Sequence, residues 1–94
     1  LTDKDGGDVF RLMLASTPEK AAERFGVLLD DSRSTDATHR AIGLLDDLFG
    51  GPRSVGTEMA IRALAGVMAS ETVIEVCTNF TRDTLARLGE AGLR

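Results

Sequence analysis

The chain has 94 residues, 43% of them hydrophobic, with a net charge of −4, one cysteine and no tryptophan or tyrosine. This length suits a single domain over residues 1–94, the acidic balance disfavours nucleic acid and anionic lipid, and one cysteine excludes an intramolecular disulfide. The single cysteine points to a reducing compartment, so we expect a cytoplasmic protein. No apolar run reaches the roughly 20 residues that span a bilayer, so we expect no membrane partner.

The first predicted helix is short and follows a polar N-terminus. Residues 1–7 include a glycine pair, and we expect them to be frayed, with Asp8 as the N-cap of an apolar segment that begins at Val9. The run Asp3–Asp8 contains three carboxylates but lacks the ligand and glycine spacing of an EF-hand calcium loop. We therefore predict no metal site there.

Thr17-Pro18-Glu19 predicts the start of a second helix, because the hydroxyl can cap the helix and proline needs no N–H at the first position. We expect this helix to run from Pro18 to about Asp30. The segment Pro18–Val27 also resembles the first half of a helix-turn-helix. This resemblance implies DNA binding as an alternative function.

Two further helices carry apolar residues at helical spacing. The third is predicted over residues 36–49, after a loop that ends in an N-cap, and Gly50-Gly51-Pro52 ends it. The fourth is predicted to start between Ser54 and Thr57 and to run to about Ala69. The stripes expected to face the core are Ala41, Leu44, Leu45, Leu48 and Phe49 on the third helix, and Ala60, Ala63, Leu64, Val67 and Met68 on the fourth.

The last element, expected after a cap at Ser70, is open to two interpretations. Several of its residues alternate as in a strand: Ile74, Val76, Thr78 and Phe80. A lone strand has no partner, and positions 73, 77, 80, 84 and 88 also form a helical stripe, so we predict a helix, kinked near Asn79 and ended by Gly92. The sequence therefore predicts an all-α, compact bundle of about five helices.

Two pairs of opposite charges stand four residues apart on the predicted helices. They are Glu58 with Arg62, and Asp83 with Arg87. Because residues at this spacing are neighbours on a helix surface, we expect both to form ion pairs within their helices.

The sequence contains no recognisable catalytic, cofactor-binding or metal-binding set. His39, the only histidine, falls on the polar side of the third helix, and the hydroxyls of Ser32–Thr35 stand where loop and cap residues are expected. Cys77 falls on the core face, where an apolar environment raises the pKa of a thiol. Glu75–Phe80 resembles a helical segment of the carboxymuconolactone decarboxylase and AhpD-like families, but Phe80 replaces the histidine of their redox members, so no activity is carried over.

The fourth predicted helix has an apolar arc wider than a one-sided amphipathic helix requires. It is therefore either central in the bundle or shared with a second chain. The candidate interface residues are Met59, Ile61, Ala65, Met68 and Ala69. We predict a non-catalytic interaction or oligomerisation module in a regulatory system, with a protein partner or a second copy in a homodimer.

Two alternatives stay open. A DNA-binding regulator with a non-standard helix-turn-helix would gather Arg33, Arg40 and Arg53 at one end of the third helix to hold phosphates. Thr84–Leu93 resembles the end of a recognition helix in bacterial winged-helix repressors. A small helical enzyme or ligand carrier is the second alternative.

Overall fold

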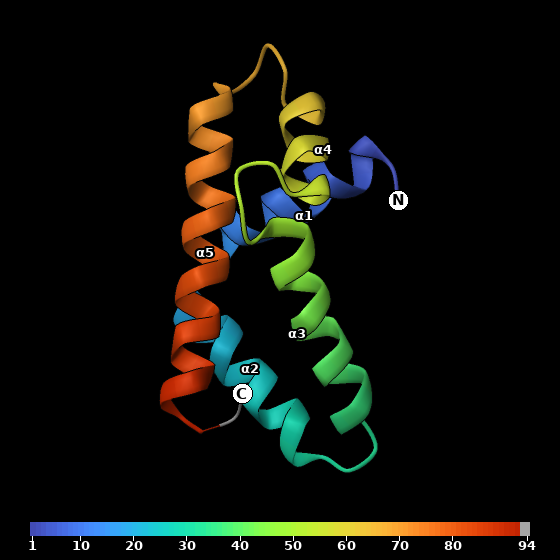
Figure 1. The fold of residues 1–94 in the computed structure, drawn as a ribbon, viewed down its shortest axis with the longest axis vertical. Coiled ribbons are helices and arrows are strands. Elements are labelled where there is room, and N and C mark those ends of the chain that lie inside the picture. The colour runs from blue at the N-terminus through green and yellow to red at the C-terminus, as the bar shows by residue number, and fades with distance from the viewer. Residues whose placement is uncertain (93–94) are drawn as a thin grey trace.

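The computed structural model describes residues 1–92, which form helices and no strand (Figure 1). The helices are α1 (Asp3–Ala15), α2 (Pro18–Asp30), α3 (Thr35–Phe49), α4 (Val55–Ala63) and α5 (Ser70–Glu90). This confirms the predicted all-α bundle and settles the last element as a helix, which continues through Asn79.

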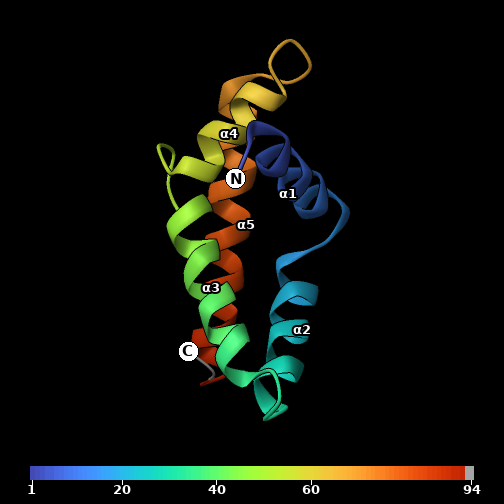
Figure 2. The same cartoon turned by 90° about the vertical axis from the view of Figure 1, so that its right-hand side faces the viewer.

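The other four helices pack against α5, which runs along the long axis of a molecule measuring 42 × 23 × 21 Å. α1 packs on α4 and α5 at one end, while α2 packs on α3 and α5 at the other. Figure 2 shows α1 and α2 following each other along one side of the molecule. Among the described residues, no backbone contact joins α1 to either α2 or α3.

The buried apolar side chains therefore form two clusters, one towards each end. The first contains Phe10, Met13, Phe49, Ala60, Leu64, Val73 and Cys77, and the second contains Ile42, Leu85 and Leu88. α3 and α5 contribute to both clusters, whereas α1 and α4 contribute only to the first and α2 only to the second. Two continuous helices thus connect the two ends of the molecule.

α1 begins six residues earlier than the sequence predicts. The side chain of Thr2 accepts a hydrogen bond from the backbone N–H of Asp5, and the Asp5 carboxylate accepts one from the Thr2 N–H, which completes a capping box. Gly6 and Gly7 are buried against α4, where a Cβ on Gly6 would lie 2.5 Å from the Met59 Cβ. The glycine pair is thus required for close packing of two helices and does not mark a frayed terminus.

The start of α4 agrees with prediction, but its end does not. The helix stops at Ala63, and the following turn contains Gly66 with φ +80°, a left-handed conformation that favours glycine. Val67, predicted to face the core, is 77% exposed. α5 then begins at Ser70 with Ala69 as its N-cap residue, and so Ser70 does not cap it as predicted.

The remaining helix boundaries follow the local sequence closely. α2 has the predicted bounds, and the Thr17 hydroxyl accepts a hydrogen bond from the Lys20 N–H. α3 ends at Phe49 as predicted and starts one residue early, at Thr35. α5 ends before Gly92, whose φ is +72°. Residue 93, the end of the segment compared with a recognition helix, lies outside the described residues.

α3 is rotated relative to its predicted apolar stripe. Thr38 and Ile42 are buried, while Ala41 and Leu44 are exposed and Leu45 is half-buried. The predicted stripe contains apolar residues only, so it did not include Thr38, a polar residue that packs inside. Part of the most apolar side of α3 consequently faces outward.

The two predicted ion pairs within helices are replaced by pairs between helices. Arg62 of α4 donates to the Asp3 carboxylate of α1 at 3.0 Å, and Arg87 of α5 donates to Glu19 of α2 at 3.2 Å. Each pair links an N-terminal helix to the helix on which it packs. Because these side chains are about half exposed, each pair contributes little to stability, on the order of 0–1 kcal/mol.

Candidate functional site

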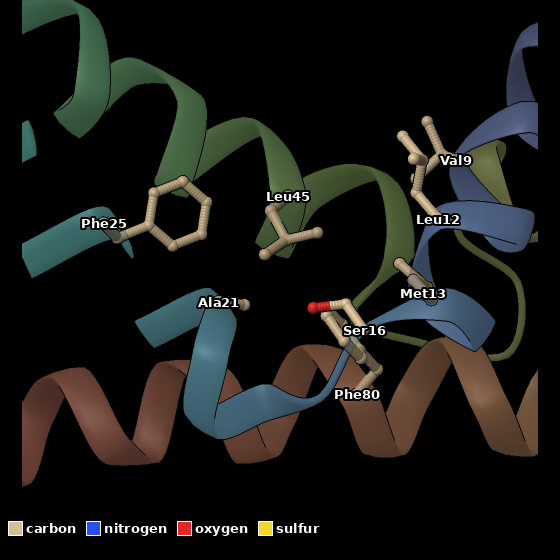
Figure 3. A pocket seen from close by; sticks show the side chains of 8 residues that line it. All are labelled: Val9, Leu12, Met13, Ser16, Ala21, Phe25, Leu45 and Phe80. Carbon is tan, nitrogen blue, oxygen red and sulfur yellow. The ribbon is translucent and has the colours of Figure 1, made fainter. Parts of the chain in front are cut away.

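The main candidate site is an apolar hollow where the two clusters meet, which we call the groove. Its volume is about 310 Å³. It is lined by Val9, Leu12, Met13, Ser16, Ala21, Phe25, Leu45 and Phe80. Figure 3 shows these side chains converging from α1, α2, α3, α5 and the connection after α1, with Phe25 at one end and Leu12 at the other.

The groove exists because the first two helices diverge. α1 ends at Ala15 and α2 begins at Pro18, so only Ser16 and Thr17 connect them. α1 follows α4 and α2 follows α3, which leaves space between their apolar sides above α5. The lining consists of seven apolar side chains and Ser16, and none of the eight is ionisable. The groove can bind apolar surface but offers no acid, base or metal ligand.

Exposed apolar side chains border the groove. Leu12, which lines it, is 68% exposed, and Leu44, next to the lining residue Leu45, is 56% exposed. Ala41 is also exposed on the same side of α3. A hollow and its rim thus form one apolar surface across α1 and α3, of the kind that in soluble proteins marks a contact site.

Buried hydroxyl groups form a second unusual feature, inside the bundle. The Oγ1 atoms of Thr57, Thr78, Thr81 and Thr84 are buried and have no hydrogen-bond partner among the described residues. Three of these threonines lie on α5 and one on α4. None lines the groove, so they do not equip it with polar groups.

Cys77 lies in the first cluster, fully buried, as the sequence predicts. Burial raises the pKa of its thiol to about 11. A thiol with such a pKa stays protonated and unreactive near neutral pH. Cys77 therefore contributes packing and no nucleophile.

The other residues considered for chemistry have structural surroundings. His39 is exposed on α3, and the nearby hydroxyls of Ser34 and Thr35 donate to the carbonyls of Leu28 and Leu29 at 2.7 and 2.8 Å. These bonds satisfy carbonyl groups at the end of α2. No group of three metal-ligating side chains comes together within residues 1–92.

The predicted interface on the fourth helix is divided by the fold. Ala60 and Ala63 of α4 pack against Gly6 and Gly7 of α1. The small residues of α4 therefore contact a helix of the same chain, as expected if this helix is central in the bundle. The five candidate residues fall into two groups: Met59, Ile61 and Met68 are half-buried, while Ala65 and Ala69 are exposed in the segment between α4 and α5.

The three candidate phosphate-binding arginines are spread along α3. Arg33 precedes its first residue and Arg53 follows its last, so they lie at opposite ends of a helix about 22 Å long, with Arg40 between. Arg33 is also held by Asp31, to whose carboxylate its guanidinium donates at 2.9 and 3.1 Å. The sequence analysis expected the three arginines to gather at one end of the helix, and the structure shows that they do not.

The described helices contain none that is both long and apolar enough to cross a membrane. The site is thus a groove and an apolar rim on a helical scaffold, with no ionisable lining. Comparison of the chain with protein-family models, with curated proteins and with solved structures finds no match.

Proposed function

We propose that the protein is a non-catalytic helical interaction module that associates with a second copy of itself through the groove and its rim. The observation that carries this proposal is the exposure of Leu12, which lines the apolar hollow, and of Leu44, which precedes the lining residue Leu45 on α3. Neither side chain can be buried by the chain's own helices in this arrangement. Covering them requires a second molecule.

The energetic gain from such a contact is substantial for a chain of this size. Burying an exposed leucine fully contributes about 1.5–3 kcal/mol, and a symmetric dimer buries each side chain twice. The groove itself carries no charge that would have to be desolvated. Apolar burial is therefore favourable there without the cost that accompanies buried ionic groups.

Oligomeric mass measured over a wide range of protein concentration tests the proposal. Sedimentation and native mass spectrometry are expected to show a monomer that converts to a dimer as concentration rises. Leu12→Glu should abolish the dimer, because it places a carboxylate at the groove. Leu14→Glu is the matched control, since Leu14 is 53% exposed on the same helix but does not line the groove.

Four other outcomes would overturn the proposal. A chain that stays monomeric at high concentration has no self-association to explain. A dimer lost on Ala65→Glu but retained on Leu12→Glu would place the contact between α4 and α5 instead. A stoichiometric small molecule in the groove, or salt-sensitive retention on DNA that weakens on Arg33→Ala, would support a carrier or a DNA-binding protein.

A further inference from the structure

The outward side of α3 combines apolar residues with a regular order of charges. Ala41 and Leu44 stand three residues apart and are both exposed, Leu44 to 56%, whereas Leu48 is half-buried and packs against the first cluster. Arg40 and Asp47 stand four residues before and three residues after Leu44, so all three share one side of the helix. Leu44 is thus flanked by a cation and an anion.

The same order extends beyond this triplet. Asp36 lies near the start of α3 and Arg53 in the loop after its end, so the charges read negative, positive, negative, positive along the helix. All four side chains belong to exposed residues, and none forms a salt bridge among the described residues. His39 and Asp46 occupy the opposite side of the helix from Leu44.

We propose that two copies of the protein pair through α3 in antiparallel orientation, with Leu44 of both copies near the two-fold axis; this inference rests on the self-association proposed above. Reversing the order of charges gives the complementary order. Arg40 of one copy then faces Asp47 of the other, and the reverse pair forms by symmetry. Asp36 and Arg53 are related in the same way, at the ends of the contact.

The charges also select against the other two-fold arrangement. A parallel pairing of the two α3 helices would place Arg40 beside Arg40 and Asp47 beside Asp47. Like charges at an interface are unfavourable and suppress wrong pairings. Attraction in one orientation and repulsion in the other fix the relative direction of the two copies.

The size of the contact shows that α3 acts together with the groove. A specific interface buries about 800 Å² per partner, roughly one seventh of the 5768 Å² surface of this chain. A single helix about 22 Å long is too small to provide this area alone. The groove adjoins α3 through Leu45, so Leu12 and the groove rim supply the remainder.

A charge-reversal experiment tests the orientation directly. Arg40→Asp and Asp47→Arg, made separately, each place like charges opposite each other twice, and each should raise the dimer Kd about tenfold, or 1.4 kcal/mol. The double variant should restore the wild-type Kd. Arg82→Asp, a reversal at an exposed position on α5, is the matched control and should leave the Kd unchanged.

Mixing the two single variants tests whether positions 40 and 47 lie at the contact, in either orientation. The Arg40→Asp chain is acidic at both positions and the Asp47→Arg chain is basic at both, so the mixture should form heterodimers well above the statistical proportion. Native mass spectrometry resolves them because the two chains differ in mass. All these substitutions are at exposed residues. Circular dichroism is the control that checks whether each variant remains folded.

The outcomes separate this inference from the proposed function. If the wild-type chain dimerises but the single variants bind as tightly as it does, or the double variant fails to recover, self-association stands and the antiparallel α3 contact is wrong. In the parallel arrangement each single variant keeps two like-charge contacts, as the wild type has, so that arrangement predicts an unchanged Kd. Tighter association of either single variant would also overturn the inference. A wild-type chain that never dimerises overturns both.

Discussion

Replacing Gly6 by alanine probes the crossing of α1 and α4, and two effects of opposite sign compete. Alanine in a helix is more stable than glycine by about 1 kcal/mol. At Gly6, however, the new Cβ would lie 2.5 Å from the Met59 Cβ and 2.9 Å from the Ala60 backbone nitrogen. Ordinary carbon contacts are about 3.5–4.0 Å, so one helix must shift by about 1 Å.

The overlap involves backbone, which cannot rotate away, and so we place its cost at the upper end for overpacking, about 3 kcal/mol. Subtracting the gain in helix propensity leaves Gly6→Ala destabilising by about 2 kcal/mol, which lowers the Tm by about 8–16 °C. Urea unfolding and calorimetry measure both values.

Gly89→Ala is the matched control for this prediction. Gly89 is helical and exposed, and nothing lies within 4 Å of its added Cβ. Only the propensity effect remains, so Gly89→Ala should stabilise the chain by about 0.5–1 kcal/mol. A Gly6→Ala protein as stable as wild type would show that α1 does not pack on α4, and would return residues 1–7 to the frayed state predicted from sequence.

Three further predictions concern the core and one helix cap. Thr81→Val should stabilise the protein by about 1–3 kcal/mol in urea unfolding, because it removes a buried hydroxyl without a partner. The control Thr72→Val, on the exposed side of α5, should change stability little. Destabilisation by Thr81→Val would show that its hydroxyl makes a hydrogen bond. Thr17→Ala should cost about 1 kcal/mol through loss of the bond from the Lys20 N–H, and Thr17→Ser should retain it. Burial raises the Cys77 pKa from 9.0 to about 11 in the folded chain, so the unfolded chain binds fewer protons between these values. Stability should therefore fall as pH rises from 9 to 11, and the fall should be smaller in Cys77→Ala.

Helix boundaries were predictable where short-range chemistry decides them. Thr17 and Pro18 determine the start of α2 through one side-chain bond and one missing N–H, and both are visible in the sequence. Gly50-Gly51-Pro52 ends α3 for equally local reasons. The position of Cys77 in the core followed from helical spacing.

The errors arose where a distant part of the chain decides the outcome. Residues 1–7 were predicted to be frayed because the role of Gly6 and Gly7 depends on α4, about fifty residues later. Leu64 and Met68 continue a helical pattern, but the chain turns at Gly66 to return along α5. No spacing rule could find the groove, since its lining comes from α1, α2, α3 and α5 and depends on how α1 and α2 diverge.

α2 is the helix held least firmly by the rest of the chain, because none of its residues is fully buried. Segments with few buried contacts open at lower free energy than the whole molecule, so α2 is the element expected to detach first while the α1–α4 end stays folded. Ala21 and Phe25, which form one wall of the groove, would leave with it. A partner that fills the groove therefore also holds α2 in place. Binding in the groove and the folding of α2 onto the bundle are thus coupled, and each can be followed by measuring the other.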